Sequence, residues 1–260
     1  MLLNVSRSFL YYEYKLELKD LQIKDMIKEV LRTHKYYGHK RIALELGLNK
    51  KRILRVMKKY NIVALRLKKK PYKKEDQNKA DTNIPNLIKT MCPLAPNVIW
   101  SCDFTYIPYK NSFIYLATVL DIYTREIIGI SVSKYHNADL VTKALIDALS
   151  KEDVPIYVHT DQGSEYTSKQ YINLLQTNEI IFSNSAKASP WENGYQESYY
   201  SNFKEELENP NRFDTAGELI GFIYQLIYYY NNERIHTALK TKPVLYKQAY
   251  FSNNLVRLTV

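Results

Sequence analysis

Three strand-like segments follow one another in the middle of the chain without a helix between them. The runs 98–109, 112–122 and 126–132 are rich in β-branched and aromatic residues, typical of strands. Residues 110–111 suit a tight turn between the first two runs, and residues 123–125 join the second run to the third. Because strands joined by such short connections pair antiparallel, this part of the chain is committed to a sheet.

Beyond these strands the pattern alternates between helix and strand. The predicted elements are a helix at 137–150, a strand at 156–160, a helix at 168–178, a strand at 180–182, and closing helices at 190–208 and 215–231. Antiparallel strands followed by this alternation are typical of a ribonuclease H-like α/β fold, a mixed sheet flanked by helices. We predict such a core for residues 98–250.

Most of the basic charge lies in the first 80 residues. They contain 22 Lys and Arg against 8 Asp and Glu, whereas residues 81–260 contain 15 against 19. This asymmetry favours nucleic acid over a membrane as the partner, with a Lys-rich solvated surface as the alternative. The chain has no apolar stretch of membrane-spanning length and no recognisable secretory signal, so we expect a cytoplasmic protein without a membrane partner. Cys92 and Cys102 lack metal-site spacing and are expected to be buried free thiols.

The basic region has the outline of a helix-turn-helix. Apolar spacing predicts a helix at 20–33, and a turn at Gly47 precedes Asn49, a good N-cap for a helix at 50–57. In such a motif the second helix enters the major groove. Its basic side chains are Lys50, Lys51, Arg52 and Arg55. A small helical bundle with a basic surface fits the same pattern.

The segment that follows this region reads as a linker. Residues 67–97 are charged and interrupted by proline, and their connecting role could be combined with tracking DNA phosphates. We therefore assign residues 1–66 to a small all-α DNA-binding region and residues 67–97 to a linker.

Three acidic residues stand out by position. Asp103 lies within the first strand, Asp161 ends a buried strand, and Glu197 lies in a predicted helix, with 35 residues between the last two. The two aspartates could converge at one edge of the sheet, with Glu197 reaching across from the helix. Carboxylates suit Mg²⁺, and two such ions can activate a nucleophile and stabilise charge at a phosphodiester. Singly, each acid would more often be a turn former, a helix cap or a solvated side chain.

The blocks around these acids resemble insertion-sequence transposases that share the retroviral-integrase core. WSCDFTY (100–106) matches the family pattern W-x-x-D-x-T-Y, and HTDQGSEY (159–166) matches H-[ST]-D-x-G-x-x-Y. YNNERIH (230–236) with Pro243 matches the closing pattern Y-N-x-x-R-x-H…P. Segments 37–42, 121–129 and 185–198 resemble further family blocks. The resemblance spans about residues 35–248. Ala188 replaces a frequent Gly and Glu192 stands where Asp is common, and neither departure touches the acids.

This resemblance implies a DDE transposase, a polynucleotidyl transferase that nicks 3′ ends of an insertion element and joins them to new DNA. Asp103, Asp161 and Glu197 would be its catalytic residues and hold two Mg²⁺ ions, with Mn²⁺ able to substitute. The implied partners are terminal inverted repeats, target DNA, further copies of the chain on DNA, and a helix-turn-helix protein from an upstream frame. The alternatives are a non-catalytic repressor of the element and a metal-dependent nuclease of the same fold.

Two residues extend the predicted site along one helix. Lys204 lies seven residues after Glu197 and Asn193 lies four before it, so all three share a helical face. The resemblance implies that Lys204 contacts DNA near the cleaved end, and Asn193 joins it as a candidate contact. The alternative for Lys204 is an exposed lysine in an ion pair.

Other residues near the motifs have less decided roles. His159 either orients Asp161 or touches the scissile phosphate, or forms a buried hydrogen bond. Gly163 is expected to allow a turn with positive φ. We expect Arg234 and His236 to be structural. Trp100 and Trp191 are expected to be core or wall residues, and stacking on an unpaired base is a further option for Trp191.

Overall fold

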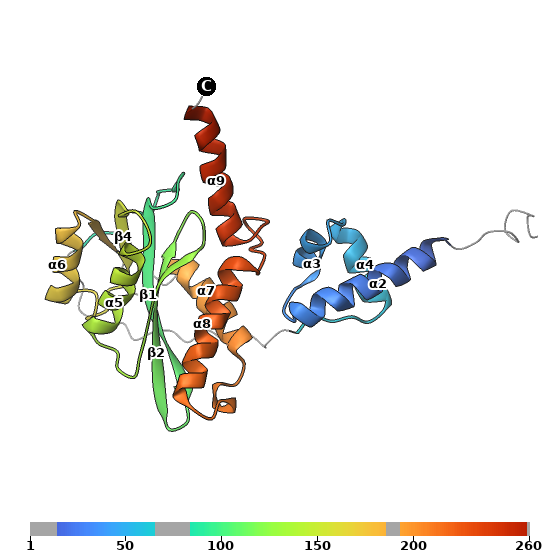
Figure 1. The fold of residues 1–260 in the computed structure, drawn as a ribbon, viewed down its shortest axis with the longest axis horizontal. Helices are drawn as coiled ribbons and strands as arrows, with labels where there is room; N and C mark the ends of the chain where they lie inside the picture. Colours follow the sequence, from blue (N-terminus) through green and yellow to red (C-terminus); the bar gives the residue numbers. More distant parts are fainter. Residues whose placement is uncertain (1–14, 66–83, 186–192, 259–260) are drawn as a thin grey trace, which may run out of the picture. The chain divides into compact units, whose positions relative to one another are not determined.

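The computed structural model describes residues 15–65, 84–185 and 193–258. The chain divides into two units, Met1–Arg66 and Leu67–Val260, which are drawn in Figure 1. Most of the predicted linker, residues 66–83, lies outside the described residues. Within the described part, no helix has the length and apolar character needed to cross a membrane.

The first unit is built from three helices. Their bounds are α2 Lys15–Thr33, α3 His39–Glu45 and α4 Lys50–Lys59. Ile27, Ile42 and Ile53 contribute one fully buried side chain from each helix. Gly47 has a φ of 62°, a conformation that glycine adopts without strain, and Asn49 Oδ1 caps α4 by accepting a 2.9 Å hydrogen bond from Lys51 N–H. The predicted helix–turn–helix outline is confirmed, although α2 begins before residue 20.

The second unit contains a five-stranded mixed sheet. Its strands are β1 Ile99–Tyr109, β2 Ser112–Asp121, β3 Ile127–Ser133, β4 Tyr157–Thr160 and β5 Ile181–Asn184. The strand order is β3-β2-β1-β4-β5, with β1–β2 and β2–β3 antiparallel and β1–β4 and β4–β5 parallel. All five predicted strands are confirmed, each starting within one residue of the expected position. The α/β fold prediction is therefore correct.

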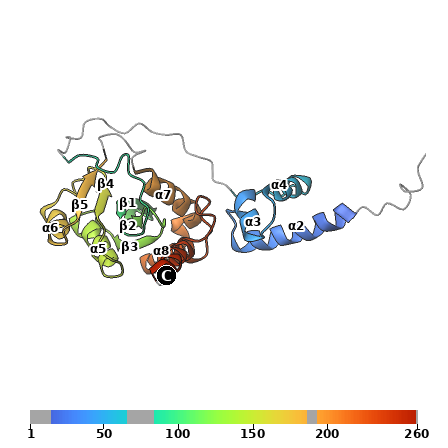
Figure 2. The ribbon, with the colours of Figure 1, turned by 90° about the horizontal axis from the view of Figure 1, so that it is seen from above.

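Helices cover both faces of this sheet. They are α5 Ala138–Leu149 and α6 Lys169–Thr177 on one face, and α7 Gly194–Leu207 and α8 Ala216–Asn232 on the other. Figure 2 shows the two helical layers on opposite sides of the strands. Residues of β1 alternate between the layers: Trp100 and Cys102 are buried with α5 and α6, whereas Ile99 and Ile107 are buried with α7 and α8. Cys92, which we expected to be buried, is exposed because it precedes β1 and lies outside both layers.

Glycine at position 129 allows α5 to lie directly on β3. A Cβ atom at Gly129 would stand 2.2 Å from the carbonyl oxygen of Ala144 and 2.8 Å from Cβ of Ala148. Both distances are far inside van der Waals contact, so any side chain here would push the helix away from the sheet.

A further helix, α9, was not predicted. It spans Pro243–Leu258 and continues past residue 250, where we had ended the core. Lys247 forms ion pairs with Glu126 and Glu152, and the ring of Tyr246 lies 5.3 Å from that of Tyr123. Because α9 contacts the core through tyrosine and lysine side chains rather than a broad apolar stripe, its periodicity is weak in the sequence.

Candidate active site

Asp103 lies on β1 where that strand loses one of its two neighbours. β4 pairs only with Ile99–Ser101 of β1, whereas β2 pairs with β1 as far as Tyr109. The edge of β1 beyond Ser101 is therefore accessible to side chains from other elements. Asp103 is partly buried there, and its Oδ1 accepts a 2.8 Å hydrogen bond from the backbone N–H of Phe104.

Asp161 follows β4 directly and reaches the same edge, because β4 runs parallel to β1. Its Oδ1 accepts a 3.0 Å hydrogen bond from the N–H of Gly163. The prediction of a positive φ at Gly163 was wrong. A Cβ at Gly163 would instead lie 3.0 Å from Asp161 Oδ1 and 3.1 Å from Glu165 Oε2. A side chain at this position would therefore crowd the carboxylates of Asp161 and Glu165, whereas the backbone conformation does not call for glycine.

Glu197 is exposed in the first turn of α7, next to the residue that anchors this helix. That residue is Gln196, whose side chain is fully buried. Its amide nitrogen donates to the carbonyl oxygens of Ser101 at 2.6 Å and Thr118 at 3.2 Å, and its amide oxygen accepts from the Thr118 hydroxyl at 3.1 Å. Hydrogen bonds to β1 and β2 thus set the position of the turn that carries Glu197.

Three further hydrogen bonds hold α7 along its length. The hydroxyl of Tyr200 donates a 2.7 Å hydrogen bond to the carbonyl oxygen of Asp103. Farther along, Arg234 donates from Nε to Glu206 and from Nη2 to Asn202, both at 2.7 Å. The side chains of Arg234 and Glu206, which form an ion pair, are both buried. Arg234 therefore has the structural role that we expected.

The charges of the three acids meet around Asp103. Burial and the nearby charge of Asp161 raise the pKa of Asp103 well above its ordinary value, and Glu197 raises it further. Lys204 opposes this effect and lowers the pKa. Side chains from β1, from the end of β4 and from α7 thus influence one another electrostatically.

The three carboxylates match a divalent metal in their chemistry. Oxygen ligands of this type are those that Mg²⁺ prefers, and a cation would relieve the repulsion that raises the pKa of Asp103. In the described ranges, no three His, Cys, Asp or Glu side chains already lie at metal-holding distances.

Lys204 and Asn193 differ in what they offer to DNA. Lys204 is exposed, and its Nζ lies 4.8 Å from the centre of the Tyr106 ring. Asn193 is buried, and its Oδ1 accepts a 2.5 Å hydrogen bond from the Ser101 hydroxyl. Asn193 therefore joins the start of α7 to β1, and its buried side chain has little surface available for a DNA contact.

The basic residues of α4 also differ in their exposure and in their partners. Lys50 and Lys51 are exposed and Arg52 is half-buried. Arg55 donates hydrogen bonds of 2.7 and 2.5 Å to the fully buried carboxylate of Asp20. Hydrogen bonding to Arg55 lowers the pKa of Asp20, and this effect is larger than the opposing effect of burial, which raises the pKa. Arg55 thus ties α4 to α2, a role that sequence reasoning missed because Asp20 lies 35 residues away.

His159 is buried, which favours the hydrogen-bonded alternative for this residue. Its Nδ1 lies 3.0 Å from the hydroxyl oxygen of Ser183, on the neighbouring strand β5. Trp191 lies outside the described residues.

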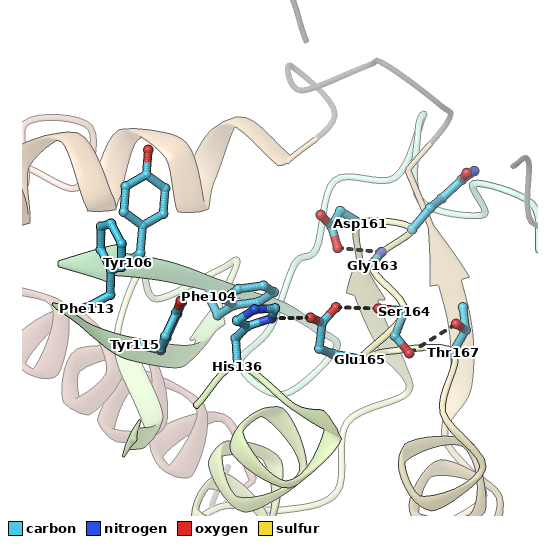
Figure 3. Close-up of a pocket in the computed structure, with 11 residues that line it drawn as sticks. Phe104, Tyr106, Phe113, Tyr115, His136, Asp161, Gly163, Ser164, Glu165 and Thr167 are labelled. Atoms are coloured by element: carbon cyan, nitrogen blue, oxygen red, sulfur yellow. Dashed lines mark hydrogen bonds and ion pairs between the residues drawn. The ribbon is translucent and has the colours of Figure 1, made fainter. Parts of the chain in front are cut away.

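A groove beside Asp161 was also missed from the sequence. Ring side chains of β1 and β2 form one side, and the loop after β4 forms the other (Figure 3). The available signal was the alternation of aromatic residues along the two strands, which a short hairpin brings to one face.

Comparisons with known proteins identify the family of the chain and its fold. Two family models, both described as integrase core domain, match residues 93–190 and 178–243. The chain is 36% identical to the transposase for insertion sequence element IS904 of Lactococcus lactis, over 85% of this chain and 90% of that protein. The catalytic core domain of HTLV-2 integrase, solved with magnesium, matches 59% of this chain and 98% of that one, with a TM-score of 0.51 and 19% identity. The simian T-cell lymphotropic virus intasome, solved with a PP2A regulatory subunit, matches 85% of this chain and 74% of that one, with a TM-score of 0.55 and 17% identity.

Proposed function

The chain belongs to the insertion-sequence transposases with an integrase core domain, which are polynucleotidyl transferases, and we propose that Asp103, Asp161 and Glu197 are its catalytic residues. In this proposal the enzyme nicks the 3′ ends of its element and transfers the freed 3′-hydroxyls to target DNA. The observation that carries it is that Asp161 and Glu197 both act electrostatically on Asp103, at the edge of β1 that β4 leaves unpaired.

The three acids would act as ligands of divalent cations. Bound Mg²⁺, two ions per site with Mn²⁺ able to substitute, would activate the attacking oxygen and stabilise charge at the phosphorus. The N–H groups of Phe104 and Gly163 orient the carboxylates of Asp103 and Asp161. Glu197 would join them from the first turn of α7, which Gln196 anchors to β1 and β2.

Separate basic surfaces would hold the DNA. Lys204 contacts a phosphate near the cleaved end, because it is exposed on the same helix as Glu197. Lys50, Lys51 and Arg52 of α4 contact the terminal inverted repeat, with residues 1–66 as the DNA-binding region and residues 67–97 as the linker. Two element ends must be joined together, so we propose that several copies act on one DNA complex, together with an upstream-frame helix-turn-helix protein.

The test is joining of a labelled duplex that ends in the element's terminal repeat, with Mg²⁺ present. Asp103→Asn, Asp161→Asn and Glu197→Gln should each retain gel-shift binding to the duplex and lose nicking and joining. The matched control is Asp139→Asn, because Asp139 is a half-exposed acid of α5 paired with Lys143. This control should join at the rate of the unmodified chain.

The same assay separates the alternatives. Wild-type joining by any of the three acid variants would refute the assigned triad. Cleavage without joining would indicate a nuclease, and binding without metal-dependent nicking would indicate a repressor.

A further inference from the structure

The groove beside Asp161 has a volume of about 860 Å³ and is bounded by two walls of different character. One wall consists of ring side chains, Phe104, Tyr106, Phe113, Tyr115 and His136. The other is the polar loop 161–165. Figure 3 shows the rings on one side and the loop on the other, with Asp161 at the loop's beginning.

Strand register produces the ring wall. Tyr106 of β1 is paired with Tyr115 of β2, and Pro108 is paired with Phe113, so these side chains share one face of the hairpin. The rings of Tyr106 and Phe113 meet edge to face at 5.7 Å. Tyr106 is nevertheless 56% exposed and Phe113 45% exposed, which leaves flat apolar surface in contact with water next to the acid cluster.

Polar groups border these rings. His136 Nδ1 lies 3.1 Å from Glu165 Oε1, and Ser164 donates to Glu165 Oε2 at 3.2 Å. On the α7 side, the ammonium group of Lys204 lies 4.8 Å from the centre of the Tyr106 ring. The groove therefore offers flat apolar contact, hydrogen-bonding groups at its border, and a cation at one end.

An unpaired nucleotide has matching parts: a flat base, polar groups on the base edge, and an anionic phosphate. Stacking on aromatic side chains is a general way to hold such bases, whereas paired bases in a duplex cannot present their faces to the rings. Building on the proposed function, we propose that this groove receives one unpaired base of the DNA substrate, from a nucleotide next to the scissile phosphate. Asp161 places the groove beside the reacting phosphate, and Lys204 places a cation close to the same nucleotide.

The experiment uses the full chain with Ca²⁺ in place of Mg²⁺, so that base insertion is measured before strand transfer. Terminal-repeat duplexes carry 2-aminopurine in turn at each of the two nucleotides on either side of the scissile bond. Binding should quench the fluorescence at one position, because the base stacks on the rings. Tyr106→Leu and Phe113→Leu should restore the fluorescence and weaken binding roughly ten-fold.

The matched control is Tyr228→Leu, because Tyr228 is 61% exposed on α8 and does not line the groove. It should quench as the unmodified chain does. An abasic site at the quenched position should slow joining by the unmodified chain, but should add nothing to the defect of Tyr106→Leu. Absence of quenching at all four positions, or quenching that persists in both groove variants, would overturn the inference.

These outcomes are separate from those that test the proposed function. Joining without quenching refutes only the base site. Quenching without joining in Mg²⁺ refutes the strand-transfer activity and leaves the base site in place.

Discussion

Replacement of Gln196 by leucine should damage both the stability of the core and the geometry of the acid cluster. Gln196 makes two hydrogen bonds to backbone carbonyls of β1 and β2 and accepts a third from Thr118, all in a fully buried position. Leucine has a similar size but can form none of them. With about 1 kcal/mol for each bond, the free energy of unfolding should fall by about 3 kcal/mol.

The effect on activity follows from the position of Glu197, the next residue in α7. Without its anchor, the first turn of α7 can shift relative to β1, and a displacement of about 1 Å at a catalytic group can slow a reaction by about a hundredfold. We expect a slower joining rate at saturating DNA and a requirement for more Mg²⁺, while DNA binding in gel shift stays near that of the unmodified chain.

Urea unfolding and single-turnover joining at several Mg²⁺ concentrations measure the two effects. Gln170→Leu is the matched control, because Gln170 is exposed on α6 and bonds only a surface carboxylate, and it should change stability by less than about 0.5 kcal/mol. Equal stability of Gln196→Leu and this control would contradict an anchoring role for Gln196. If the core is destabilised but joining at each Mg²⁺ concentration is unchanged, Gln196 has no positioning role.

Two further predictions concern packing and charge. Gly129→Ala should destabilise the core by about 3 kcal/mol or more, because the added methyl group overlaps Ala144 of α5; Gly221→Ala, on open helix surface, is the control in urea unfolding. Arg55→Met should destabilise the first unit by about 2 kcal/mol at pH 7, because it removes the main partner of buried Asp20, and hydrogen exchange of α2 and α4 measures this. The pKa of Asp20 is lowered in the folded state. The ionised carboxylate therefore stabilises the first unit at any pH above its unfolded pKa of about 3.9, and this stabilisation is lost as the pH falls through the folded pKa. In the unmodified chain, the protection of α2 and α4 against hydrogen exchange should thus decrease only below about pH 4. Equal protection of α2 and α4 in Arg55→Met and the unmodified chain would contradict this role of Arg55.

The sequence was most informative where residue spacing repeats with secondary structure. Alternation in the strands and apolar spacing in α5 and α6 gave element bounds close to those observed, because side-chain burial follows these periods directly. α9 was missed because its docking depends on contacts such as Lys247 with Glu152, between residues far apart in the sequence. Gly163 was misjudged because the constraint on it is the space beside Asp161 and Glu165, which no local pattern reveals.

The sequence by itself determined the strands, the helices up to α8, their order, and the three acids with the motifs around them. Only the tertiary structure decided which polar residues face the site and which support it. Arg55 and Asn193 look like DNA contacts on a helical face, yet Arg55 pairs with the buried carboxylate of Asp20 and Asn193 is itself buried against Ser101. The physical reason is that a buried polar group needs a partner, and that partner can come from any part of the chain that the fold brings near.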